Sequence, residues 1–142
     1  MELKGKFLSF PEKLFDRNIR KFYLGMHEED EDRVIIFDEL ESNSFDNFYV
    51  LYFGNIIVAF LIFRVKQDYI NIRKIMILET KSIKKLIKIC LEDFKNFFHR
   101  KLRLMVDETS SSIVKLYQSV GLQKSKWRDP DFSSNYRGMK YF

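Results

Sequence analysis

The chain has 142 residues, of which 46% are hydrophobic and 32% charged, and its formal net charge is +5. This length suits one domain with a substantial core, and the composition excludes a disordered or fibrous protein. The mild positive charge favours anionic partners without requiring them. We therefore expect a single folded domain over residues 1–142.

The cysteine content and the hydropathy indicate a soluble cytoplasmic protein. Cys90 is the single cysteine, so an internal disulfide is excluded and packing is its expected role. The first residues include acids and lack the continuous apolar segment of a signal peptide. The longest apolar run, Ile56–Phe63, is far shorter than the roughly 20 residues that a membrane helix needs.

The first third of the chain predicts a strand followed by two helices. Leu3–Leu8 alternates loosely between apolar and polar residues, as an edge strand does. A capping-box spacing begins a helix from about Phe10 to Met26. The acidic run His27–Asp32 then precedes a short helix, Val34–Leu40. We interpret that run as a solvated helix start or loop, and the alternative is a lip for a cationic substrate.

The middle of the chain predicts three strands joined by tight turns. Asn47–Phe53 and Ile56–Val65 are rich in aromatic and β-branched residues, and they flank Gly54-Asn55. Two such runs around a Gly-Asn pair are typical of a β-hairpin. Ile70–Leu78 follows after a second turn, so we expect an antiparallel meander.

The clearest helical pattern runs from about Thr80 to Phe98, with Thr80 as its expected N-cap. Leu102–Val106 follows as a buried strand. Because a helix connects this strand to the one before it, we expect the two strands to be parallel. The apolar face of the helix should contain Ile83, Leu86, Ile87, Cys90, Leu91, Phe94 and either Phe97 or Phe98.

The last third predicts a short helix capped by Ser110 or Ser111 and ended by Gly121, then strands at Leu122–Arg128 and Asn135–Phe142. This order of elements predicts an α/β fold of the α+β mixed-sheet kind. Its central sheet should be mostly antiparallel, with one parallel strand pair and helices on both faces. The face of the short helix should contain Ile113, Leu116, Tyr117 and Val120.

This order, with the sequence LYQSVGL near the end, resembles the GNAT N-acetyltransferase superfamily over most of the chain. Members commonly carry Asn-x-x-Ala-x-x-Leu-Tyr-x-x-x-Gly-Phe across the last helix. Leu116, Tyr117 and Gly121 match this pattern, and Leu122 replaces the Phe conservatively. The closing YRGMKYF and the run IIVAFLIF are also similar to family strands. The resemblance implies a GNAT-like fold whose parallel strands splay apart to form a V-shaped groove.

The chain departs from the family at the loop that begins the long helix. Members carry Gln/Arg-x-x-Gly-x-Gly/Ala there, and its backbone N–H groups hold the pyrophosphate of acetyl-CoA. The corresponding residues, Leu78–Ile83, contain no glycine, so side chains hinder the close approach of backbone to phosphate. What remains is a helix N-terminus with Lys81, Lys84 and Lys85, which attracts anions through its dipole and charge.

The resemblance implies direct transfer of an acetyl group from acetyl-CoA to a primary amine. Tyr117 matches the tyrosine that acts as general acid in the family, whereas helical spacing alone makes it part of a packed face. Glu79 ends the central strand, where a base would deprotonate the amine. Asp107 and Glu108 end the next strand and are candidates for the same role. Each of these three carboxylates is alternatively a structural helix-start group. The implied cofactor-binding residues are Ile77, Leu78, Lys81, Ser82, Ile83, Lys84 and Ser110.

Other chemistries lack their motifs. His27 and His99 show no metal-ligand spacing with Cys90, and no nucleophile elbow or glycine-rich nucleotide loop is present. The alternative function is a catalytically degenerate GNAT-like module that binds a protein or a nucleic acid near Trp127. No pattern identifies the acceptor amine or the oligomeric state. The basic residues that favour such a module are Arg100, Lys101, Arg103, Lys124, Lys126 and Arg128.

Overall fold

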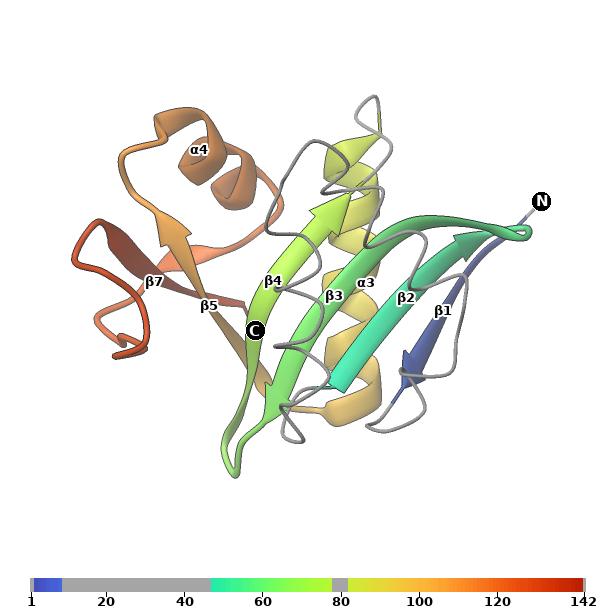
Figure 1. Cartoon of the computed structure of the whole chain (residues 1–142), viewed down its shortest axis with the longest axis horizontal. Helices are drawn as coiled ribbons and strands as arrows, with labels where there is room; N and C mark the ends of the chain where they lie inside the picture. The colour runs from blue at the N-terminus through green and yellow to red at the C-terminus, as the bar shows by residue number, and fades with distance from the viewer. Residues whose placement is uncertain (1, 9–46, 78–81, 142) are drawn as a thin grey trace, which may run out of the picture. The chain divides into compact units, whose positions relative to one another are not determined.

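The computed structural model describes residues 2–8, 47–77 and 82–141 (Figure 1). Their strands form a seven-stranded sheet in the order β1-β2-β3-β4-β5-β7-β6. The described residues belong to two compact units, one with residues 2–8, 47–64 and 74–77, and one with residues 65–73 and 82–141. The helices predicted at Phe10–Met26 and Val34–Leu40 lie outside the described residues.

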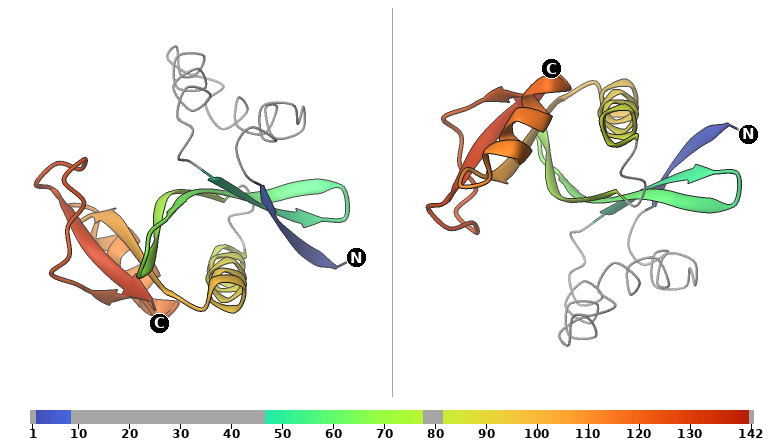
Figure 2. Two further views of the ribbon diagram at one scale, coloured as in Figure 1. Left: turned by 90° about the horizontal axis from the view of Figure 1, so that it is seen from below. Right: turned by 90° about the horizontal axis from the view of Figure 1, so that it is seen from above.

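The first unit contains β1 (Leu3–Leu8), β2 (Asn47–Phe53) and most of β3 (Ile56–Val65). The three strands lie side by side, with β1 antiparallel to β2 and β2 antiparallel to β3 (Figures 1 and 2). Gly54 has a φ of 62° in the turn between β2 and β3, a backbone conformation that glycine adopts without a steric penalty. The bounds of all three strands and the predicted hairpin are therefore confirmed.

Apolar side chains make the core of the first unit. The rings of Phe48 and Phe60 pack edge to face with centroids 4.7 Å apart, a favoured geometry for aromatic pairs. Because alternate residues of a strand point to the same face, the alternation in β2 and β3 directs a continuous set of side chains into this cluster. Its buried members are Leu8, Phe48, Val50, Ile57, Phe60, Ile62 and Met76.

The second unit is built around β5 (Lys101–Asp107) and β7 (Tyr136–Tyr141), which are antiparallel. The strand β4 (Tyr69–Ile77) pairs with β5 in parallel, from Tyr69 opposite Lys101 to Ile72 opposite Leu104. The predicted parallel pair is confirmed. The register ends at Ile72 although both strands continue beyond it. A groove between their ends stays a prediction.

The helix α3 (Ile83–Phe98) packs against β5. Its N-cap is Ser82, whose carbonyl oxygen accepts the N–H of Leu86 at 2.9 Å. The prediction that Thr80 is the N-cap is therefore wrong. Thr80 itself lies outside the described residues. His99 ends the helix in the left-handed conformation, with a φ of 55°. The buried residues match the predicted face, and Phe97 is 63% exposed.

The helix α4 (Ser111–Ser119) follows β5, packs against it and has the predicted Ser110 as its N-cap (Figure 2). Its predicted inward face is partly wrong, because Ile113 is 42% exposed and Val114 is buried. Leu116 and Tyr117 are half-buried and Val120 is buried, so the helix departs from the predicted face only in its first turn. Gly121 has a positive φ of 109°, as expected for a residue that ends a helix.

The strand β6 is much shorter than predicted and contains Gln123–Lys124 instead of Leu122–Arg128. The ladder with β7 continues to the N–H of Ser125, which donates to the carbonyl oxygen of Gly138 at 2.9 Å. The chain then leaves the sheet because Trp127 packs edge to face on Tyr69, with centroids 5.6 Å apart. A tertiary contact therefore overrides the local strand pattern.

Candidate functional site

The residues predicted from the family resemblance come from three elements. Ile77 ends β4, Ser82, Ile83 and Lys84 begin α3, and Ser110 caps α4, which carries Tyr117. The predicted base Glu79 and the predicted cofactor-binding residues Leu78 and Lys81 lie outside the described residues.

The first turn of α3 has features that favour an anion. Its N-cap, Ser82, makes no side-chain capping hydrogen bond, and the turn contains no acidic residue. The first N–H groups of a helix have no partner within the helix. Lys84 and Lys85 are exposed and add positive charge at the same end. These features fit a phosphate group, which helix N-termini bind through N–H donors and the helix dipole.

Tyr117 is half-buried near the end of α4. Its hydroxyl has no hydrogen-bond partner among the residues that the structure describes. Burial removes water from this hydroxyl and raises the pKa of Tyr117 to about 12. Its carbonyl oxygen accepts the N–H groups of Val120 and Leu122 at 3.2 and 3.1 Å, which fixes the last turn of the helix. The side chain is therefore a protonated donor without an internal acceptor in the described part of the chain.

Asp107 has a structural role in the turn before α4. Its carboxylate Oδ1 accepts the hydroxyl of Thr109 at 2.6 Å and the Thr109 N–H at 3.0 Å. Its carbonyl oxygen accepts the N–H of Ser110 at 3.2 Å. These contacts hold the chain between β5 and α4, as expected of an aspartate that forms a local turn. They favour the structural interpretation of Asp107 over the role of a base.

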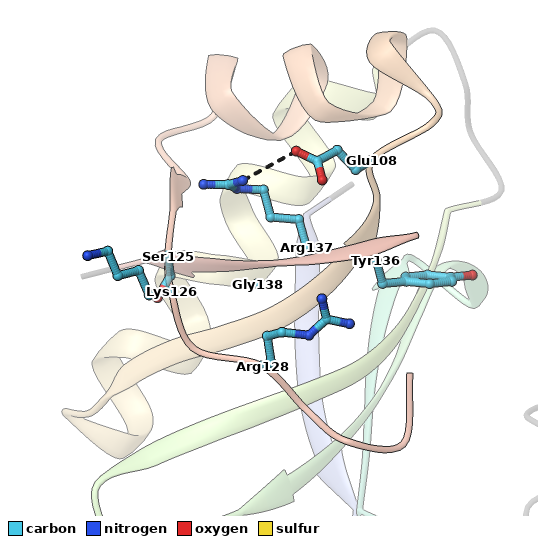
Figure 3. Close-up of a pocket in the computed structure, with 7 residues that line it drawn as sticks. All are labelled: Glu108, Ser125, Lys126, Arg128, Tyr136, Arg137 and Gly138. Carbon is cyan, nitrogen blue, oxygen red and sulfur yellow. Dashed lines mark hydrogen bonds and ion pairs between the residues drawn. The ribbon is translucent and has the colours of Figure 1, made fainter. Parts of the chain in front are cut away.

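A pocket of about 240 Å³ lies beside the end of β5 (Figure 3). Within it the carboxylate of Glu108 lies 3.3 Å from the guanidinium of Arg137, and the two groups point toward each other (Figure 3). The guanidinium of Arg128 donates to the carbonyl oxygen of Ser133 at 2.9 Å. Three cations and one carboxylate give the pocket a positive charge. Its lining residues are Glu108, Ser125, Lys126, Arg128, Tyr136, Arg137 and Gly138.

One wall of this pocket is the segment from Ser125 to Arg128, which crosses β7 at Gly138. A Cβ at Gly138 would overlap the backbone oxygen of Trp127, so this crossing requires glycine. The Trp127 ring does not line the pocket. It packs with Tyr69 and with Arg103, whose guanidinium lies 5.5 Å from the Trp127 centroid. Trp127 thus anchors the segment that carries Lys126 and Arg128.

The loop that follows is anchored by a buried carboxylate. Asp129 is 5% exposed, and its Oδ2 accepts the amide of Asn71 at 3.0 Å and the guanidinium of Arg73 at 2.9 Å. Its Oδ1 accepts the N–H of Asp131 at 3.0 Å. The chain at Asp129-Pro130 is thereby tied to β4.

No sequence pattern marks this pocket as a site. Lys126 and Arg128 belong to the predicted basic residues near Trp127, and Glu108 is one of several candidate carboxylates. Arg137 has no signal of its own, because it lies in the run predicted as the closing strand. The described residues contain no cluster of three or more potential metal ligands. None of the described helices has the length and apolar character to cross a membrane.

The chain has the fold of known N-acetyltransferases. It matches a spermidine N-acetyltransferase SpeG chimera from Vibrio cholerae and hSSAT with a TM-score of 0.70 and 17% identity, over 99% of this chain and 95% of that chain. It matches the N-acetyltransferase PseH of Campylobacter jejuni with a TM-score of 0.67 and 10% identity, over 97% of this chain and 96% of that chain.

A Bacillus subtilis acetyltransferase in complex with CoA matches with a TM-score of 0.64 and 14% identity, over 99% of this chain and 98% of that chain. No protein-family model matches the sequence, and a search of curated proteins finds no significant match. The expected GNAT-like fold, with a mostly antiparallel mixed sheet and one parallel pair, is confirmed.

Proposed function

We propose that this chain is an N-acetyltransferase that moves an acetyl group from acetyl-CoA to a primary amine. The observation that carries the proposal is the match to the SpeG chimera and to PseH over at least 95% of each chain compared. The same fold is found in an acetyltransferase crystallised with CoA. Because a fold hosts more than one function, the proposed chemistry depends on this chain's own residues.

The first turn of α3 supplies the anion-binding part of the cofactor site. The N–H groups of Ile83 and Lys84 have no partner within the helix, the first turn carries no acid, and Lys84 adds charge. Leu78, Lys81 and Ser82 belong to the same segment and complete the proposed site with Ile77 and Ser110. The absence of glycine in this segment leaves the helix dipole and the lysines as the main attraction for phosphate.

Acetyl-CoA supplies the acetyl group as a thioester. The nitrogen lone pair of the neutral amine forms the new C–N bond, the C–S bond breaks, and the amine gives up one proton. We assign Glu79 as the base that takes this proton. Backbone N–H groups near Ile77 stabilise the negative charge that develops on the carbonyl oxygen.

We assign Tyr117 as the general acid, whose hydroxyl donates a hydrogen bond to the sulfur as the C–S bond breaks. A free thiol has a pKa of about 8.5, below the value of about 12 for Tyr117, so complete transfer of the proton is uphill. The hydroxyl therefore acts mainly as a hydrogen-bond donor that stabilises the thiolate. Its lack of a hydrogen-bond partner among the described residues leaves it available for this role.

The first test is calorimetric titration of the purified protein with acetyl-CoA, followed by a screen of amine acceptors. We expect saturable binding and acetyl transfer. Tyr117→Phe should keep cofactor binding and lower kcat about 100-fold, at the lower end of general-acid effects. Tyr69→Phe is the matched control, because it removes a hydroxyl while keeping the ring that packs on Trp127. No binding at millimolar acetyl-CoA would contradict the proposal and favour the binding module that has lost catalysis.

The pH profile of kcat tests the state of Tyr117 separately. Because its pKa is raised to about 12, the hydroxyl stays protonated through neutral and moderately alkaline pH. We expect Tyr117 to cause no loss of kcat between pH 7 and about pH 10. A basic limb below pH 9 that disappears in Tyr117→Phe would show that its pKa in the complex is much lower.

A further inference from the structure

We propose that the pocket around Lys126, Arg128 and Arg137 binds an anionic group, a carboxylate or a phosphate, of the amine that accepts the acetyl group. This inference rests on the proposed function and adds to it a class of substrate. Lys126, Arg128 and Arg137 all line the same pocket (Figure 3).

The cations of the pocket have unused donors. Lys126 is exposed and has no hydrogen bond or ion pair among the described residues. Arg128 gives one hydrogen bond, to the carbonyl oxygen of Ser133. The Nε of Arg137 is buried and has no partner in the described part of the chain. A guanidinium has five N–H donors, and its planar fork matches carboxylate and phosphate oxygens. An anion in the pocket would accept hydrogen bonds from the exposed donors of these side chains, such as those of the Arg137 guanidinium beside Glu108 (Figure 3).

The ion pair between Glu108 and Arg137 does not close the site. Both side chains are more than a third exposed, at 46% and 40%, and such pairs contribute little to stability. Glu108 holds the Arg137 side chain toward the pocket while leaving most of its donors free. Lys126 and Arg128 have no carboxylate partner among the described residues, so the pocket keeps its positive charge when Glu108 is ionised.

The size and position of the pocket favour a head group of a substrate. A volume of about 240 Å³ is below the roughly 300–1,000 Å³ of sites that enclose a whole small molecule. Glu108 directly follows the carboxyl end of β5, which pairs in parallel with β4. Ligands of open α/β sheets bind at the carboxyl ends of parallel strands. The start of α3 is already proposed to bind a phosphate of acetyl-CoA. We therefore assign this pocket to the amine that accepts the acetyl group.

Direct anion binding is the first test. Trp127 is the single tryptophan and lies between two lining residues, so its fluorescence reports on the pocket during titration with inorganic phosphate or acetate. We expect saturable binding in the millimolar range, confirmed by calorimetry, and about tenfold weaker binding in Arg137→Gln. Lys115→Gln, the same loss of charge on an exposed residue of α4, should leave binding unchanged. No saturation at tens of millimolar by either method would overturn the inference.

The acceptor preference distinguishes a substrate site from a cofactor site. We expect amines that carry a carboxylate or phosphate to be better acceptors than their neutral amides or alcohols. Arg137→Gln and Lys126→Gln should raise KM for the charged amine about tenfold, with little change for its neutral analogue or for the affinity of acetyl-CoA. If these variants instead weaken acetyl-CoA binding, the pocket belongs to the cofactor and the assignment to the acceptor is wrong.

The two proposals fail in different ways. Acetyl transfer without any preference for anionic amines would overturn the pocket assignment and leave the acetyltransferase function standing. Saturable phosphate binding that depends on Arg137, in a protein that does not bind acetyl-CoA, would contradict the proposed function. The anion site itself would then stand, but its assignment to an acetyl acceptor would fall.

Discussion

The strands β2 and β3 of the first unit and the strands β5 and β7 of the second unit are stabilised in different ways. In the first, the core cluster consists of apolar side chains such as Phe48, Phe60 and Ile62. In the second, the buried polar residues Asn71 and Asp129 join an apolar core. Apolar burial is non-directional, whereas a buried carboxylate requires each of its partners. We therefore expect the second unit to be far more sensitive to the removal of a few polar atoms.

The largest effect should come from Asp129→Ala. This change leaves the buried Asn71 amide without its acceptor and removes one of the two carboxylates that contact Arg73, which should cost about 3 kcal/mol. Asp131→Ala is the matched control, because its carboxylate also contacts Arg73, at 3.1 Å, but is 59% exposed. It should cost less than about 1 kcal/mol. Urea unfolding measures both values, and equal values would contradict the importance of burial.

Gly138→Ala should separate stability from anion binding. The added methyl group would overlap the Trp127 oxygen, and the segment that carries Lys126 must shift, at a cost of about 1–3 kcal/mol. We expect phosphate binding to be lost as well, because the shift deforms the pocket. Gly121→Ala is the control. The positive φ of Gly121, 109°, makes an alanine there strained, and Gly121 is not one of the residues that line the pocket. This variant should lose stability, measured by thermal unfolding, and keep phosphate binding.

Tyr141→Phe tests a polar contact with a distinct pH dependence. The Tyr141 hydroxyl donates to the carboxylate of Glu92, and removing such a bond costs about 1–2 kcal/mol. Burial and the negative charge of Glu92 raise the pKa of Tyr141 to about 12, from 10.0. Folding therefore stabilises the protonated form of the Tyr141 hydroxyl. The resulting contribution to the stability of the folded state is present below pH 10 and is lost as the pH rises toward 12.

Urea unfolding at pH 7, 10 and 12 checks this prediction. The difference in stability between the native chain and Tyr141→Phe should shrink between pH 10 and 12. Tyrosinate absorbance in the folded protein should also show one fewer late-titrating group in the variant. A difference that stays constant over this range would mean that Tyr141 titrates with an ordinary pKa.

The same contrast explains what the sequence could predict. The hairpin of the first unit follows from local patterns, because two runs rich in aromatic and β-branched residues flank the Gly54-Asn55 turn and their ends fix its bounds. In the second unit, the contact between Asn71 and Asp129 joins residues 58 positions apart. The early end of β6 likewise depends on the packing of Trp127 on Tyr69. Neither contact has a local sequence signature.

The candidate site divides in the same way. The role proposed for Tyr117 follows from the resemblance of the last helix to a family motif, and the position of α3 follows from a helical pattern. The pocket combines Glu108 after β5 with Arg137 on β7, and its shape depends on a glycine that permits a chain crossing at Trp127. No periodic pattern connects these residues, so the pocket could be recognised only after the strands were placed together.

The smallest expected effect is that of Ile62→Val in β3. Ile62 is 3% exposed within the apolar cluster, and removing one buried methylene group costs about 0.5–1.5 kcal/mol. Ile56→Val, at a position that is 61% exposed, is the same chemical change and should be nearly neutral. Urea unfolding of both variants measures the contribution of apolar burial alone. A loss for Ile62→Val as large as that for Asp129→Ala would mean that the first unit also depends on exact shape, and the contrast between the two regions would fail.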